Sequence, residues 1–385
     1  MVDYVRINIV RFVITIITVF VLLIGYYKLQ FPFWSRQPVF HLHNIYYWTF
    51  PPGIITEKLP IKGRFFDDAI QYNNFYNIDK ETLTNFVDFI KNNYSPKPIE
   101  KYEPTYESIV DCFKGQPGVP ALTLKIYDGK ILSSMTSREL ECKIETNKLK
   151  INYVDFLCVH EKHRRKMYAG EQIWTHYYHT CHNRGNLISF FKRENQKTWI
   201  VPFSTYFNYI FKTNNWTPCF DFEQSNINII YIDKSNQNKF YQLFMESREK
   251  FNYYITMNLG HIFYLINSGH IKVMVLMLNT TFMGYYVFRN PYTTYDGLQS
   301  LECITSYKND MVDNNVFVLG FMISMSLVSK DYKSEILLIE NVANNNIIIN
   351  MLLEKYSYLD RCVNSLYFYN FAYYPKDSNE ILTFF

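Results

Sequence analysis

The segment that most constrains the fold is residues 151–185, which combines a strand, a basic loop and a helix. Residues 151–159 are rich in β-branched and aromatic side chains, as strands are. Residues 162–166 then read Lys-His-Arg-Arg-Lys, and apolar residues at helical spacing follow until Gly185, which favours a helix C-cap. A loop between a strand and a helix N-terminus offers backbone N–H groups and the helix dipole to an anion. The segment therefore predicts a phosphate-binding loop.

The motifs that the sequence lacks reduce the range of phosphorylated ligands that this loop could bind. The chain has no G-x-x-x-x-G-K-[ST] and no G-x-G-x-x-G, which argues against an NTPase and against a dinucleotide-dependent oxidoreductase. It also has no G-x-S-x-G, which argues against a hydrolase. Coenzyme A remains, because its phosphates suit the backbone amides of residues 166–170 together with the basic side chains of 164–166. A solvated basic turn is the alternative reading of the same loop.

Charge and cysteine usage exclude other classes. The net charge is only +4 in 385 residues, so we expect no nucleic-acid partner. The seven cysteines include no C-x-x-C pair, which favours a reducing compartment over a disulfide framework. His176, His179 and His182 recur in steps of three, which spreads them over about 120° of a helix surface, so we expect no metal.

An uncharged run of sixteen residues, 12–27, lies near the N-terminus between Arg11 and Lys28. A full span needs roughly 20 apolar residues, and the basic flanks can extend this one by snorkelling. A cleaved signal peptide and a buried core helix are the alternatives, but no A-x-A-like site follows Gly25. We predict that residues 1–29 are a tail whose residues 12–27 anchor a monomer to a membrane, with the body in the cytosol.

Three segments resemble one family. Residues 156–160 read Phe-Leu-Cys-Val-His and are followed by Arg164, Lys166 and Ala169. Residues 33–39 read Phe-Trp-Ser-Arg-Gln-Pro-Val, and residues 366–371 read Leu-Tyr-Phe-Tyr-Asn-Phe. In this order they closely resemble the motifs of the glycylpeptide N-myristoyltransferases, and the resemblance covers the chain from about residue 31 to its end.

The resemblance implies a mixed α/β fold of two pseudo-symmetric acetyltransferase-like (GNAT-like) lobes. Residues 30–215 would bind the acyl-CoA and residues 216–385 the peptide. The order of expected helices and strands repeats in the second half, which independently suggests a duplication. The activity implied is transfer of a myristoyl group from myristoyl-CoA, as co-substrate, to the N-terminal glycine of a protein, with no permanently bound cofactor.

The resemblance also assigns site residues. Two backbone amides in a strand bulge, at Phe156 and Leu157, would hold the thioester oxygen as it becomes an oxyanion, which is commonly worth about 3 kcal/mol. The α-carboxylate of Phe385 would be the general base, positioned by the segment around Tyr369 and Asn370. The acyl-CoA would be held by Phe33, Trp34, Arg164, Arg165, Lys166, Met167, Tyr168, Ala169 and Gly170.

The acceptor site departs from the family. The family's asparagine and threonine that contact the substrate amine fall at Asp155 and Lys192, and its histidine falls at Asn208. Asp155 would hold an ammonium or supply a second base, whereas Lys192 would repel an ammonium or pair with Asp155. Two alternatives to glycine acylation follow. One is acylation of a lysine amine, and the other is a non-catalytic acyl-CoA-binding or structural membrane protein.

Overall fold

The computed structural model describes residues 2–94, 100–194, 199–213, 216 and 227–385. The helices are α1 (Val2–Gln30), α2 (Ile45–Thr49), α3 (Lys80–Asn93), α4 (Tyr106–Asp111), α5 (Tyr168–Arg184), α6 (Gln237–Lys250), α7 (Leu259–Asn267), α8 (Asn314–Tyr332) and α9 (Asn345–Lys355). The strands of the first half are β1 (Gly53–Ile54), β2 (Ile70–Asn74), β3 (Glu100–Tyr102), β4 (Ala121–Tyr127), β5 (Lys130–Ile144), β6 (Asn147–Val159), β7 (Ser189–Glu194) and β8 (Ser204–Lys212). Those of the second half are β9 (Ile227–Tyr231), β10 (Tyr253–Thr256), β11 (Ile271–Leu278), β12 (Thr281–Arg289), β13 (Thr293–Tyr295), β14 (Leu298–Lys308), β15 (Ile336–Glu340), β16 (Asp360–Tyr369), β17 (Phe371–Ala372) and β18 (Ile381–Phe384).

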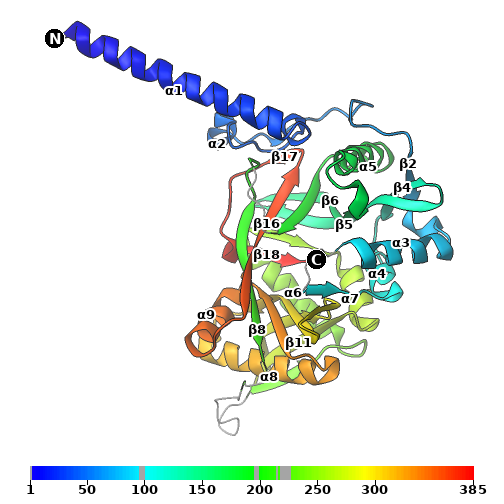
Figure 1. Cartoon of the computed structure of the whole chain (residues 1–385). Coiled ribbons are helices and arrows are strands. Elements are labelled where there is room, and N and C mark those ends of the chain that lie inside the picture. Colours follow the sequence, from blue (N-terminus) through cyan, green and yellow to red (C-terminus); the bar gives the residue numbers. More distant parts are fainter. Residues whose placement is uncertain (1, 95–99, 195–198, 214–215, 217–226) are drawn as a thin grey trace.

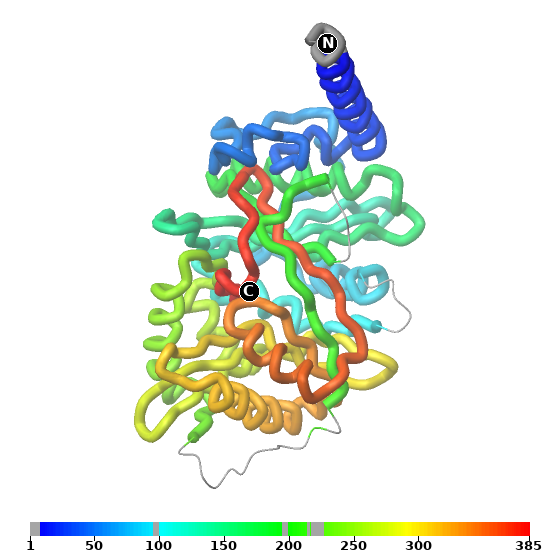
Figure 2. Tube along the Cα trace, turned by 90° about the vertical axis from the view of Figure 1, so that its left-hand side faces the viewer, coloured from blue at the N-terminus to red at the C-terminus, as the bar shows by residue number. Residues whose placement is uncertain are grey.

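Most of these strands form one mixed sheet, so the predicted α/β class is confirmed. The strand order is β18-β10-β5-β6-β7-β16-β8-β15-β14-β12-β11-β9. The pairs β6–β7, β14–β15 and β10–β18 are parallel, and the other pairs along this path are antiparallel. Figure 2 shows β16 running alongside β8 through the middle of the molecule.

The two halves of the chain repeat one arrangement. In the first, β6 leads through α5 to its parallel neighbour β7, and in the second, β14 leads through α8 to its parallel neighbour β15. Each unit is preceded by an antiparallel partner strand, and the ladder slips at a bulge on both β6 and β14. The expected lobe boundary at residue 215 lies outside the described residues. The sheet itself is continuous, because β8 pairs with both β15 and β16.

The local signals in the sequence have the expected structures. Asp128 and Gly129 take positive φ angles of 49° and 69° and join β4 to β5 as a hairpin. α5 ends at Gly185, whose φ is 70° and whose N–H donates to the Cys181 carbonyl oxygen at 2.9 Å. The predicted strand and helix of residues 151–185 are therefore confirmed.

The two helix starts of the repeated units differ. The N-cap of α5 is Met167, in the left-handed region, and no side chain caps this end. The N-cap of α8 is Asp313, whose carboxylate accepts from the Asn315 N–H at 2.8 Å. A side-chain carboxylate satisfies a helix N-terminus much as a bound anion does. Only α5 keeps its N-terminal donors for another group.

α1 projects from the body (Figure 1). Asn8–Gln30 is apolar, with a mean hydropathy of 2.5, and none of its most apolar 18-residue window is buried inside the structure. By length and composition, this one described helix could cross a membrane. The apolar helix is therefore longer than residues 12–27. Its last turns are docked, since Tyr27 is only 1% exposed, packs on Trp199 at 5.3 Å between ring centroids, and bonds His41 Nδ1 at 3.2 Å.

Candidate active site

A bulge in β6 lies at residues 156–157. Two residues of β6 are opposite one residue of β5 here, so neither has a partner in the register. Phe156 has φ of +48°, a conformation that non-glycine residues adopt rarely. Ser134 Oγ donates to the Phe156 carbonyl and Thr136 Oγ1 donates to the Asp155 carbonyl, both at 3.0 Å. These bonds hold the carbonyls on the β5 side, which orients the bulge.

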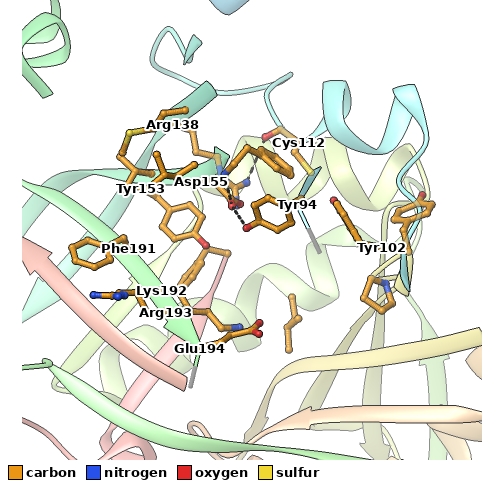
Figure 3. Close-up of a pocket in the computed structure, with 18 of the residues that line it drawn as sticks. Tyr94, Tyr102, Cys112, Arg138, Tyr153, Asp155, Phe191, Lys192, Arg193 and Glu194 are labelled. Atoms are coloured by element: carbon orange, nitrogen blue, oxygen red, sulfur yellow. Dashed lines mark hydrogen bonds between the residues drawn. The ribbon is translucent and has the colours of Figure 1, made fainter. Parts of the chain in front are cut away.

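Asp155 occupies one of the two bulge amides. Its Oδ1 accepts a hydrogen bond from the Phe156 N–H at 2.8 Å, and the Tyr94 hydroxyl lies 3.5 Å from the same oxygen (Figure 3). Asp155 contacts Lys192 in none of the described hydrogen bonds or ion pairs, so the pair considered from the sequence is not present. The carboxylate instead accepts from the Phe156 N–H, one of the two amides that the resemblance assigned to an oxyanion.

The predicted phosphate loop leads from η3 (Glu161–His163) into α5. Gly170 N–H donates to the Met167 carbonyl at 2.8 Å, so this amide is used internally. Within the described part of the chain, the amides of residues 166–169 donate to no protein acceptor. Arg165 and Met167 have φ of +64° and +63°, and such turns make successive N–H groups converge. Four of the five predicted amides are therefore available to an anion.

The basic side chains of the loop divide into two groups. Arg164 donates from Nε to the Val159 carbonyl at 3.2 Å and from Nη2 to the Asn93 carbonyl at 2.5 Å, so it fastens the loop to β6 and α3. Arg165 and Lys166 are exposed and extend from the loop. Of the three basic side chains predicted to assist an anion site, 164–166, these two extend into solvent, whereas Arg164 is bonded to the body.

The arm after α1 covers the start of α5. The Phe33 ring is 5% exposed, and a Cβ added to Gly170 would approach it to 2.9 Å, so glycine is required at this close contact. Trp34 stacks on Phe191 with ring centroids 5.9 Å apart and lines the central cavity. Trp34 therefore faces the cavity, whereas Phe33 packs between the arm and α5.

One cavity of about 760 Å³ connects the predicted site residues. Those that line it are Trp34, Asp155, Phe156, Leu157, Ala169, Lys192, Asn208, Tyr369 and Phe385. Phe33, Asn370 and residues 164–168 and 170 lie outside this lining. The cavity thus runs from the start of α5, past the bulge of β6, to the last residue of the sequence.

Phe385 is held inside the body rather than at the surface. β18 pairs in parallel with β10, and the Phe385 ring contacts Tyr153 and Phe190 at 4.8 and 5.7 Å between centroids. Arg289 Nη1 donates to the Phe385 oxygen at 3.3 Å, and its Nε donates to Glu302 at 2.6 Å. Burial lowers the pKa of Arg289, but its ion pair with Glu302 outweighs this, so the net pKa is raised and the guanidinium stays charged.

Lys192 belongs to a second buried ion pair. Its Nζ bonds Glu340, which also accepts from Tyr206 OH at 3.2 Å and from Asn364 Nδ2 at 3.3 Å. Burial lowers the pKa of Lys192, but the Glu340 carboxylate raises it by more, so the net pKa is raised. Lys192 therefore stays protonated, and Glu340 balances its charge. Asn208, opposite Glu340 in the β8–β15 register, has an Oδ1 without a partner among the described residues.

Tyr369 and Asn370 fasten the arm. The Tyr369 hydroxyl donates to Gln37 Oε1 at 2.5 Å. Asn370 is fully buried with φ of +61°, and its side chain bonds the Thr56 N–H and carbonyl at 2.9 and 2.8 Å. Tyr369 lines the cavity and Asn370 clamps the backbone behind it.

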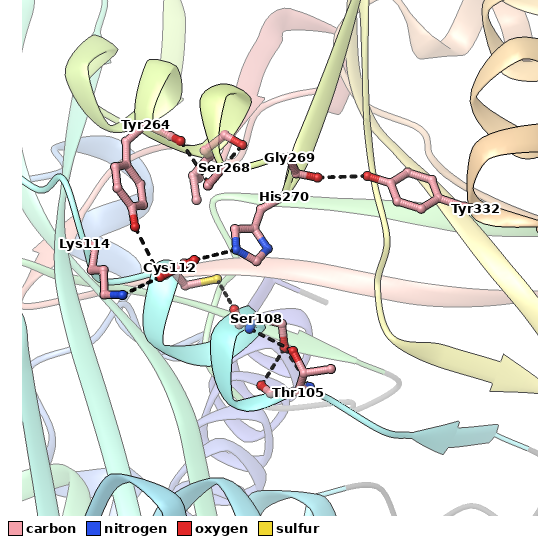
Figure 4. Close-up of polar contacts among 11 residues, drawn as sticks. Thr105, Ser108, Cys112, Lys114, Tyr264, Ser268, Gly269, His270 and Tyr332 are labelled. Atoms are coloured by element: carbon pink, nitrogen blue, oxygen red, sulfur yellow. Dashed lines mark hydrogen bonds and ion pairs between the residues drawn. The ribbon is translucent and has the colours of Figure 1, made fainter. Parts of the chain in front are cut away.

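Titratable residues that the sequence reasoning missed also line the cavity: Glu100, Arg138, Arg193, Glu194, His270, Arg289 and Glu302. His270 Nε2 bonds Asp111 Oδ2 at 2.8 Å and Tyr264 donates to Asp111 Oδ1 at 3.2 Å (Figure 4), which ties α4 to the second half of the chain. Burial raises the pKa of the Asp111 carboxyl, but its hydrogen bonds from Lys114 and His270 lower it more. A charged residue between apolar neighbours, as Glu302 is between Leu301 and Cys303, is the signal that was available.

The three helix histidines have separate partners. His176 Nδ1 bonds Thr123 Oγ1 at 2.8 Å, His179 stacks on Tyr72 and His182 bonds the Pro60 carbonyl at 2.9 Å. Among the described residues, no group of three or more His, Cys, Asp and Glu side chains is placed to hold a metal ion. These histidines pack α5 against its neighbours.

Comparisons with known proteins identify the fold. No protein-family profile matches the sequence, and no curated protein matches it. Solved structures do match: Saccharomyces cerevisiae N-myristoyltransferase with bound myristoyl-CoA superposes with a TM-score of 0.70 at 13% identity, over 90% of this chain and 94% of the other. A second structure of that enzyme with bound myristoyl-CoA gives 0.70 at 12%, over 91% and 90%. A third, with myristoyl-CoA and inhibitors, gives 0.69 at 13%, over 93% and 95%. The chain has the N-myristoyltransferase fold, as the three motifs predicted.

Proposed function

We propose that this protein transfers a myristoyl group from myristoyl-CoA to the N-terminal glycine amine of a protein. The observation that carries the proposal is the single cavity that joins the uncapped start of α5, the β6 bulge and Phe385. The yeast enzyme with the same fold and bound myristoyl-CoA supports the choice of acyl donor. Residues 30–215 would provide the donor half and residues 216–385 most of the acceptor half.

The donor would be held by main-chain groups. Its phosphates would accept from the amides of residues 166–169, assisted by Arg165 and Lys166. Trp34 would cover the pantetheine, and the thioester oxygen would accept from the bulge amides at residues 156–157, after the Asp155 carboxylate has turned away. Fixed donors of this kind stabilise an oxyanion in the transition state.

The acceptor would be activated at the other end of the cavity. In a chain that ends at Phe385, its α-carboxylate takes a proton from the acceptor ammonium, and the free amine attacks the thioester carbon. The C–N bond forms, the C–S bond breaks, and coenzyme A leaves as the thiol. Arg289 holds the carboxylate in place by a hydrogen bond. Asp155, once released from the Phe156 amide, would face the incoming ammonium.

Turnover tests the proposal directly. Full-length protein in lipid nanodiscs is incubated with myristoyl-CoA and a glycine-initiated octapeptide, and thiol release and product mass are measured. We expect acylated peptide, and none from an N-acetylated control. Product only on a lysine-containing, N-acetylated peptide would reassign the acceptor. Donor binding without product would favour the second candidate function, a non-catalytic acyl-CoA-binding membrane protein. The observation behind this candidate is the hydrogen bond of Asp155 to the Phe156 N–H, which occupies a proposed oxyanion donor.

The terminal base has its own test. Two residues added after Phe385 should abolish turnover, because they remove the α-carboxylate from this position. Donor affinity should be unchanged, because β18 still pairs with β10 and the residues 166–169 that would hold the phosphates are not altered. The matched control inserts the same two residues at the exposed hairpin turn of Asp128 and Gly129. Normal turnover of the extended chain would refute the terminal-base mechanism.

We also infer that α1 anchors the protein to a membrane as a monomer, with the body in the cytosol. The apolar length of Asn8–Gln30 and its exposure support the anchor. Vesicle flotation tests it, and protease accessibility of the body in intact cells tests the orientation. A full-length protein that stays in the aqueous fraction would refute the anchor.

A further inference from the structure

The arm that follows α1 exposes an unusual amount of apolar surface. Residues 37–56 contain no Asp, Glu, Lys or Arg. Within this stretch, α2 and its neighbours leave large apolar side chains in solvent, among them Ile45 at 68%, Tyr46 at 64% and Phe50 at 61%. Leu42 at 51% and Ile54 at 36% are exposed in the same stretch. Patches of this kind mark sites of protein or membrane contact.

The position of the patch selects between those partners. Figure 1 shows α2 beside the last turns of α1, on the face from which α1 leaves the body. The inward side of α2 is packed, because the Tyr47 and Trp48 rings contact Phe40 at 5.7 and 5.0 Å between centroids. A surface at the end of a membrane span, rich in Trp and Tyr and free of charge, has the composition of a bilayer interface.

The connection between α1 and this patch is rigid. Tyr27, in the penultimate turn of α1, is buried against Trp199 and bonded to His41 of the arm. Trp48 Nε1 donates to the Leu42 carbonyl at 3.2 Å, and the arm is bonded to Asn370 at Thr56. An inserted α1 therefore carries α2 to a fixed depth.

We propose that residues 42–56, called the arm surface below, form a second membrane contact that lies in the head-group layer of the bilayer spanned by α1. This inference rests on the proposed anchoring by α1. The molecules that the arm surface contacts are membrane lipids. Because Trp34 of the same arm lines the cavity, docking of the arm surface fixes the orientation of the active site above the membrane.

Depth-dependent quenching tests the contact. An environment-sensitive fluorescent amino acid replaces Tyr46 or, as a control, the exposed Tyr127 of the β4–β5 hairpin in the full chain. Both proteins are reconstituted in phosphatidylcholine vesicles with a nitroxide on acyl carbon 5, and recovery by flotation is measured first. We expect nitroxide to quench residue 46 at least fivefold more than residue 127, and aqueous iodide to do the reverse.

The outcomes separate the surface from the anchor. Failure to float would overturn the anchor and, with it, the arm surface. Flotation with equal nitroxide quenching at the two positions would overturn the arm surface alone. Residue 46 shielded from both quenchers would assign the patch to a protein partner and also overturn it. Phe50→Asp should lower nitroxide quenching at residue 46 severalfold without loss of flotation, whereas Leu353→Asp on α9 should change neither.

Discussion

Replacement of Asp155 by Asn changes one group at the centre of the proposed donor site. The Asp155 carboxylate accepts from the Phe156 N–H at 2.8 Å, and an incoming thioester oxygen needs the same donor. Binding of the donor must therefore break a hydrogen bond between a charged acceptor and a backbone amide. The asparagine side chain has the same shape but offers only a neutral acceptor.

The magnitude follows from the two bond types. A hydrogen bond to a charged group contributes about 1.5–3 kcal/mol and a neutral one about 0.5–1.5 kcal/mol, so the displaced bond is weaker by about 1 kcal/mol in the variant. Since 1.4 kcal/mol corresponds to tenfold, Asp155→Asn should bind myristoyl-CoA about fivefold more tightly.

Isothermal titration of myristoyl-CoA into the full chain measures this difference. Asp88→Asn is the matched control, because Asp88 is an exposed carboxylate on α3 outside the cavity lining. The Asp88→Asn variant should bind myristoyl-CoA with the affinity of the unchanged protein. An unchanged or weakened affinity in Asp155→Asn, with an unchanged melting temperature, would refute the idea that this carboxylate competes with the donor.

Three further predictions concern stability. Glu340→Gln should lower the free energy of unfolding by about 3 kcal/mol in urea titrations, because it leaves the buried Lys192 charge unpaired; adding Lys192→Met should recover most of the loss. Asn370→Ala removes the side-chain bonds to the arm, so we expect a loss of about 3 kcal/mol and faster proteolysis of residues 37–63, and unchanged proteolysis would contradict the clamp. Burial lowers the pKa of both His176 and His261 to about 3. In the unfolded chain both histidines gain a proton below about pH 6.5, whereas in the folded protein they do not. As the pH falls from 6 to 4, each histidine should therefore lower the free energy of unfolding by about 1.4 kcal/mol per pH unit. His261→Gln should remove the contribution of one histidine, which is half of the slope that the two produce together.

Local pattern was sufficient for the elements that form the proposed donor half of the site. The strand, the basic loop and the helix of residues 151–185 are adjacent in sequence, so periodicity and the glycine cap predicted them as they are. The bulge at Phe156 followed from the motif resemblance. The position of Asp155 on the neighbouring amide is a side-chain conformation, which no pattern of residue types specifies.

The acceptor half depends on strand order, which sequence reasoning did not supply. Lys192 was considered as a partner of Asp155, but β16 and β8 lie between β7 and β15, and this order brings Glu340 to the Lys192 ammonium from 148 residues away. The arm brings Gln37 to Tyr369 across 332 residues. Contacts of such long range are set by the whole sheet rather than by any segment.

The two repeated units of the fold do not offer equivalent sites for an anion. The start of α8 is already satisfied by the Asp313 carboxylate, whereas the start of α5 has no such internal substitute. A coenzyme phosphate arriving at the second unit would meet a resident negative charge. Each molecule should accordingly bind a single molecule of the proposed donor, which gives a binding stoichiometry of one although the arrangement of elements occurs twice.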